Sequence, residues 1–163
     1  MYIEINETAE LHLGTFDIRQ FKSYETLHSF LWAGNATFTL VSKASQCRYT
    51  FNIHKSKFTG VTDNYFVSVL NGPNNKYDYL YLGMINPTFQ TLRLTKGSKV
   101  SKEAPSYIAF SWFIRLLFSN PKRLFTLATI WHEGKCGRCG RKLTVPSSIE
   151  AGIGPECASK LGD

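Results

Sequence analysis

The chain has 163 residues, of which 43% are hydrophobic and 14% aromatic, and it carries a formal net charge of +7. This apolar content excludes a disordered chain and is enough for a buried core. The sequence contains no run of 18 apolar residues, and its first residues lack the basic and apolar regions of a signal peptide, so we expect a soluble cytoplasmic protein with no membrane contact.

The positive charge is concentrated in the middle of the chain. Residues 37–131 contain twelve basic and three acidic side chains, whereas residues 1–36 contain two and five, and residues 132–163 contain five and four. We expect an acidic helical segment (1–36) packed on the core, a basic α+β domain (37–125) and a small module with three cysteines (126–163).

Hydrophobic periodicity predicts one helix and five strands before residue 95. Ser23 can cap the helix, and Gly34 can end it. The apolar stripe of this helix consists of Tyr24, Leu27, Phe30 and Leu31. Strands are expected at residues 37–42, 47–53, 65–70, 80–85 and 88–94. Because only short polar breaks separate them, an antiparallel meander is the simplest topology.

Alternation within the second strand predicts a buried cysteine. Between residues 46 and 54, apolar side chains occupy the odd positions and polar side chains the even ones. Cys47 falls on the apolar side, and free cysteine is among the most buried residue types. We therefore expect Cys47 in the core, apart from the other three cysteines.

A strongly apolar helix is predicted after the strands. Pro105 suits its first position, and residues 106–119 are nearly all apolar, with Arg115 as the single charge. The segment is too short to span a bilayer, so we expect a buried helix laid across the sheet. The predicted class is α+β, with a mainly antiparallel sheet, this packed helix and a zinc-knuckle or treble-clef-like module at the C-terminal end.

Four side chains near the C-terminal end have the spacing of zinc ligands: His132, Cys136, Cys139 and Cys157. Gly137 and Gly140 supply the backbone freedom of a knuckle. A proline at position 155 can start a short helix whose amide end faces Cys157. A closed set of four ligands predicts structural Zn²⁺ with no catalytic role.

Other uses of these cysteines fit less well. A Cys-x-x-Cys redox motif would open a helix after a strand, and it leaves Cys157 without a role. A zinc deaminase requires His-x-Glu and Pro-Cys-x-x-Cys, and neither is present. Two disulfides are disfavoured because three of the four cysteines lie in the last 28 residues of a chain without an export signal. For His132 a non-ligand role stays open, in which water or another donor completes the shell.

The run from Cys136-Gly-Arg-Cys-Gly-Arg-Lys-Leu to Gly-Ile-Gly-Pro-Glu-Cys157 resembles the C-terminal module of short proteins encoded by bacteriophages, prophages and plasmids. The resemblance extends more loosely upstream, so that it covers about residues 37–160. It implies an origin in a mobile element and zinc binding. It brings no established biochemical activity, so function must be inferred from the residues themselves.

The basic domain favours nucleic-acid binding. Four cations lie within ten residues, and nearby tyrosines at positions 77, 79 and 81 can stack bases; the cations are Arg93, Lys96, Lys99 and Lys102. The alternative is a protein-binding inhibitor or modulator of a host factor, of the anti-defence type, for which zinc is purely structural. In the cysteine module, a second set of cations either contacts the partner or belongs to a scaffold, namely Arg138, Arg141 and Lys142.

An enzyme is not expected. The sequence shows no paired carboxylates, no phosphate-cradling glycine loop and no nucleophile with an adjacent base. A small-molecule substrate is therefore not predicted either. The partner's identity and the oligomeric state stay open.

Overall fold

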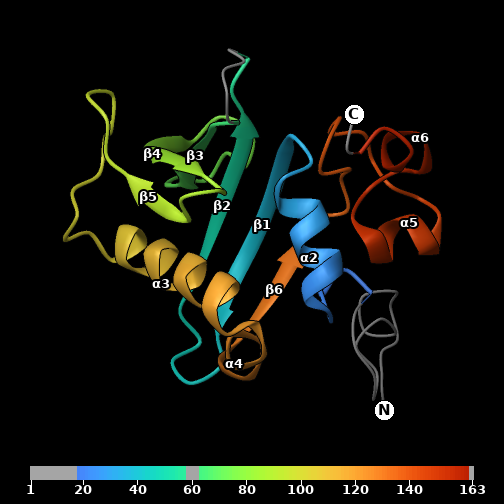
Figure 1. The fold of residues 1–163 in the computed structure, drawn as a ribbon, viewed down its shortest axis with the longest axis horizontal. Helices are drawn as coiled ribbons and strands as arrows, with labels where there is room; N and C mark the ends of the chain where they lie inside the picture. The colour runs from blue at the N-terminus through green and yellow to red at the C-terminus, as the bar shows by residue number, and fades with distance from the viewer. Residues whose placement is uncertain (1–17, 58–62, 162–163) are drawn as a thin grey trace.

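The computed structural model describes residues 18–57 and 63–161. Its centre is a six-stranded antiparallel sheet with the strand order β5-β4-β3-β2-β1-β6 (Figure 1). The strands are β1 (Asn35–Ser42), β2 (Arg48–Lys55), β3 (Tyr65–Leu70), β4 (Tyr79–Asn86), β5 (Thr91–Arg93) and β6 (Ala128–His132). The first five form the predicted meander, and β6 joins the free edge of β1. The predicted α+β class is confirmed.

Three helices cover one face of the sheet, on the side nearer the viewer in Figure 1. They are α2 (Tyr24–Leu31), α3 (Pro105–Ser119) and α4 (Pro121–Leu127). The aromatic rings of Phe110 and Phe113 on α3 lie 5.0 and 5.2 Å from those of Phe51 and Phe38 on the sheet. This aromatic layer is the centre of the hydrophobic core.

The cap and the apolar stripe of α2 agree with the sequence. The Ser23 hydroxyl accepts a hydrogen bond from the Thr26 amide at 3.2 Å, as expected of an N-cap. Leu27, Phe30 and Leu31 are fully buried. The side chain at position 32 stacks on Phe118 of α3, so the two helices lie side by side over the sheet.

Helix α3 lies across the sheet as expected, but it is buried on one side only. Its buried residues are Phe110, Phe113, Ile114 and Leu117. Ile108 is 56% exposed. A single sheet can cover only one side of a helix, and within residues 18–57 and 63–161 no second layer packs on the outer side of α3.

The prediction that Cys47 is buried is wrong. Strand β2 begins at Arg48, so Cys47 lies in the β1–β2 turn, where its carbonyl accepts a hydrogen bond from the Ser42 amide at 2.9 Å. The thiol is exposed. Alternation correctly assigned Cys47 to the face of the sheet that the helices cover. Cys47 lies just before the start of β2, however, where no helix of the described residues covers its thiol.

Two strands also differ from their predicted limits. β5 covers only Thr91–Arg93, because a turn takes up residues 88–90 and Gln90 has a positive φ of 57°. β6 was not expected as a strand. It lies within the range 126–163 assigned to the cysteine module from the sequence, yet it pairs with β1 from Phe38↔His132 to Ser42↔Ala128.

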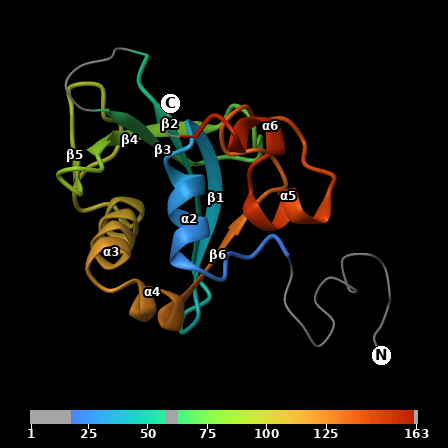
Figure 2. The same cartoon turned by 45° about the vertical axis from the view of Figure 1, so that its right-hand side comes forward.

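The remaining helices, α5 (Pro146–Ala151) and α6 (Pro155–Ala158), belong to the C-terminal tail. Figure 2 shows them beside α2, on the side away from α3. No helix among the described residues is long and apolar enough to cross a membrane.

Candidate metal centre

The tail begins as a short hairpin that continues from β6. The Leu143 amide donates to the Gly134 carbonyl and the Cys136 amide donates to the Arg141 carbonyl, both at 2.8 Å. Gly134 and Gly140 have φ values of 86° and 80°, a backbone conformation that glycine adopts without strain. The predicted knuckle is therefore present.

Three cysteine sulfurs converge at this knuckle. Cys136 and Cys139 come from the turn and Cys157 from α6, and their Sγ atoms all lie within 4.8 Å of one another. Three thiolates bound to one tetrahedral zinc at a Zn–S distance of about 2.3 Å would be roughly 3.8 Å apart. The cluster can thus hold a metal ion after a small contraction.

The Cys136 thiol ionises more readily than an ordinary cysteine. Burial by itself raises its pKa, but hydrogen bonds from three backbone amides, together with one from the Cys139 side chain, outweigh burial and lower the pKa to about 7. These amides belong to Cys139, Gly154 and Arg138, and the last two lie 3.5 and 3.4 Å from the sulfur. The Gly154 amide at the start of α6 therefore points at Cys136, whereas the sequence predicted that this end faces Cys157.

The Cys157 thiol behaves in the opposite way. Burial, followed by hydrogen bonds to the other two thiols and the negative charge of Cys136, raises its pKa. The Arg138 side chain donates to this sulfur and opposes the rise. Three neighbouring thiols cannot all ionise without a compensating cation, and a divalent metal supplies that charge.

His132 does not join the cysteines. It is the third inward-facing residue of β6 after Ala128 and Ile130, and its side chain is 4% exposed. Its ring packs against both Phe21 and Phe30, at centroid distances of 5.3 and 5.7 Å.

Both ring nitrogens of His132 have backbone partners. Nδ1 accepts a hydrogen bond from the Gly134 amide at 2.9 Å, and Nε2 donates to the Ile149 carbonyl. The spacing predicted four ligands around one metal. The structure instead brings three cysteines together and places His132 beside them in the core.

The knuckle is packed directly on α2. The Gly137 amide donates to the Gly152 carbonyl at 2.8 Å, and its carbonyl accepts from the Asn35 amide at 2.7 Å. A Cβ atom at Gly137 would lie 2.6 Å from a ring carbon of Phe30. Glycine is required here because no side chain fits between the turn and the helix.

The predicted cationic residues lie on two separate surfaces. Arg93, Lys96, Lys99 and Lys102 are exposed on β5 and the segment that follows it. Within the described residues, none of these four takes part in an ion pair. Arg138, Arg141 and Lys142 are exposed on the knuckle.

The three tyrosines differ in exposure. Tyr77 is 71% exposed in the β3–β4 loop, whereas Tyr79 and Tyr81 are half-buried. Tyr81 lies against Gly97 and shares a hydrogen bond of 3.1 Å with the hydroxyl of Thr95. Two of the three expected stacking rings are therefore only partly accessible.

Residues 128–162 match the model of a protein family of unknown function, DUF6011. The match starts at the first residue of β6 and includes all three clustered cysteines, so the matched unit combines the edge strand with the candidate metal centre. No curated protein and no solved structure matches the chain. An origin in a mobile element stays a prediction.

Proposed function

We propose that the three-cysteine cluster holds one structural Zn²⁺ and that the basic α+β domain binds nucleic acid. Thiolate ligands at these separations suit zinc, and the tail is too small for a core of its own. Water or another donor completes the tetrahedron. No catalytic role is proposed for any residue.

The charge of the exposed segment after β5 carries the nucleic-acid proposal. Four cations lie in the segment from Arg93 to Lys102, and none of them forms an ion pair with a carboxylate of the described residues. The backbone there is fixed, since the Lys99 amide donates to the Tyr81 carbonyl at 2.9 Å. A rigid, uncompensated row of cations is what a polyanionic backbone requires.

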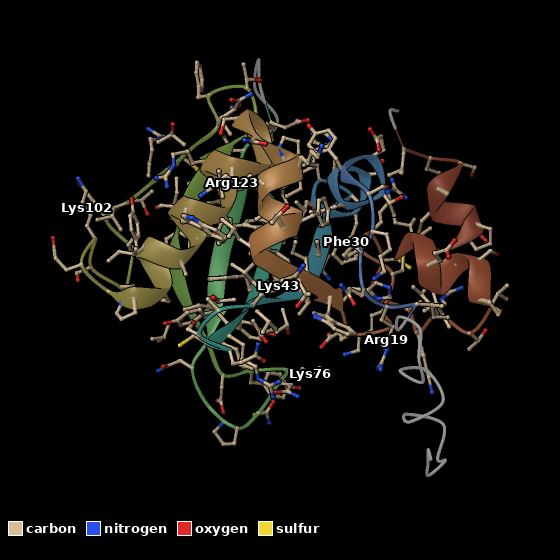
Figure 3. The ribbon with its side chains drawn as sticks, turned by 90° about the horizontal axis from the view of Figure 1, so that it is seen from below. Arg19, Phe30, Lys43, Lys76, Lys102 and Arg123 are labelled. Atoms are coloured by element: carbon tan, nitrogen blue, oxygen red, sulfur yellow. The ribbon has the colours of Figure 1, made fainter. Side chains whose placement is uncertain are left out.

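A binding assay with a salt series tests this proposal. Fluorescence anisotropy with labelled single- and double-stranded DNA and RNA is expected to show binding that weakens steeply with salt. The double variant Lys96→Glu/Lys99→Glu should bind more weakly. The matched control is Lys122→Glu/Arg123→Glu, which makes the same charge change on α4, where Figure 3 labels Arg123. Undetectable binding to all four probes at low salt would contradict the proposal.

The flank of α3 at the end of the sheet favours a second candidate, a host-protein inhibitor or modulator. An apolar hollow of about 440 Å³ lies between the sheet end and α3, and its lining includes Leu40, Tyr49, Ile108 and Trp112. Apolar surface of this kind is typical of protein contacts. A stoichiometric partner that survives nuclease treatment and is lost with Ile108→Asp would support this reading over the first.

A further inference from the structure

The face of the sheet opposite the helices is hollowed. Two adjoining hollows of about 880 and 400 Å³ lie along it, and both are lined by Asn75, Tyr79 and Glu133. Tyr79 begins β4 and Asn75 belongs to the β3–β4 loop, whereas Glu133 follows β6. The hollows therefore form one groove, which we call the sheet groove, running from the β6 edge to the β3–β4 loop.

The β3–β4 loop is a braced wall for this groove. The Asn71 amide donates to the Asp78 carbonyl, and the Asn74 amide donates to the Asp78 carboxylate, both at 2.7 Å. The Asn74 side chain in turn accepts from the Lys76 amide at 2.8 Å. Figure 3 shows Lys76 on the side of the sheet away from α3 and α4. The wall is thus fixed before any ligand binds.

Cations dominate the rim of the sheet groove. The larger hollow is lined by Lys43 and Arg48, and the smaller by Lys76 and Lys135. Among the described residues that line either hollow, Glu133 is the one carboxylate, and it lies 3.6 Å from the Lys135 ammonium. The excess of positive charge fits a polyanion.

The floor of the groove combines polar and aromatic side chains. Its hydroxyl and amide groups come from Thr37, Thr39, Thr50, Asn52 and Ser68. Trp131 lines the β6 end of the larger hollow. The half-buried Tyr79 lines both hollows. Polar groups can read base edges, and the accessible faces of half-buried rings can stack bases.

We propose that the sheet groove binds single-stranded nucleic acid. The inference rests on the proposed function and specifies its substrate: phosphates lie along the cationic rim, and unstacked bases lie on the floor. A duplex keeps its bases stacked inside, so it cannot use the aromatic floor. The row from Arg93 to Lys102 at the opposite edge of the sheet then contributes long-range attraction.

Anisotropy with labelled oligonucleotides of about ten residues, within the usual span of single-strand binding surfaces, tests the inference. The metal-loaded full chain should bind oligothymidine or oligouridine at least about tenfold more tightly than a duplex of the same length. Comparison of the two single strands distinguishes DNA from RNA. Arg48→Glu/Lys76→Glu should weaken single-strand binding at least about tenfold, whereas Lys122→Glu/Arg123→Glu on α4 should leave it within about twofold.

Tryptophan fluorescence gives an independent readout. The chain has three tryptophans. Trp32 and Trp112 lie on the helix side, while Trp131 faces the groove. A single strand should quench the emission, and Trp131→Phe should remove the quenching while binding by anisotropy persists.

The outcomes separate the two proposals. Absence of binding to any nucleic acid overturns both. Equal affinity for duplex and single strand overturns the groove inference alone, and so does a loss of binding with Lys96→Glu/Lys99→Glu but not with Arg48→Glu/Lys76→Glu. Quenching that persists in Trp131→Phe overturns the placement of the strand on the groove floor.

Discussion

Replacing His132 by glutamine separates a core role from a metal-ligand role. Glutamine keeps an N–H donor near the position of Nε2, so the bond to the Ile149 carbonyl can re-form. It lacks an acceptor at the position of Nδ1, so the Gly134 amide loses its partner. If His132 is a core residue, the cost of the change falls on stability and not on metal binding.

The size of the effect follows from these contacts. Leaving a partly buried backbone donor without a partner costs at most about 1–3 kcal/mol. For a domain of this size, that corresponds to a fall in Tm of roughly 2–10 °C. His132→Ala removes both hydrogen bonds and the packing against Phe21 and Phe30, for which we expect about 3–5 kcal/mol. That loss approaches the whole stability of a small domain, so glutamine is the better variant.

Zinc content and scanning calorimetry measure the two effects on one sample. His132→Gln should retain about one zinc per chain, with an affinity within about tenfold of the parent, because three thiolates stay in place. Cys139→Ser is the matched control and should lose most of the metal. Equal loss of zinc from His132→Gln and Cys139→Ser would refute the core role of His132.

Three further predictions concern the tail. Chelation of the metal should expose the amides of Gly137 and Gly140 to hydrogen exchange, while the β1–β2 amides stay protected because the sheet has its own core. If the knuckle and the β1–β2 amides lost their protection together, the metal would not be acting as a local stabiliser. Gly137→Ala should destabilise the protein by about 1–3 kcal/mol in thermal unfolding because its Cβ would collide with Phe30, whereas Gly97→Ala, with 3.6 Å of clearance, should be nearly neutral. In metal-free Cys47→Ser protein, alkylation of Cys136 should rise with pH and reach half its maximum near pH 7, because the thiolate forms above the lowered pKa; a midpoint near the ordinary pKa of 9.0 would contradict the amide hydrogen bonds.

The sequence predicts features that depend on local periodicity. The cap at Ser23, the alternation of β1 to β4 and the start of α3 at Pro105 are each encoded within a few neighbouring residues. The spacing of residues along the chain does not predict the direction in which a side chain points. His132 has a suitable distance along the chain from Cys136, but strand alternation turns it toward the core with Ile130.

The missed strand had a readable signal. Between positions 128 and 132 apolar Ala128 and Ile130 alternate with Thr129, which is the two-residue period of a strand, and this parity assigns His132 to the inner face. The sheet groove could not be read in the same way. Its lining comes from the N-terminal segment, five strands and three loops, and only the pairing order of the sheet brings these residues together.

Strand β6 connects the candidate metal centre with the groove. Trp131 faces the groove, His132 faces the core, and Glu133 and Lys135 then form the groove rim directly before Cys136. The knuckle is tied back to the start of β1 by the hydrogen bond from the Asn35 amide to the Gly137 carbonyl. A metal that holds the three cysteines together therefore also fixes the β6 edge of the groove. Zinc can support nucleic-acid binding in this way without touching the ligand, because a preformed rim loses less conformational entropy when the ligand binds.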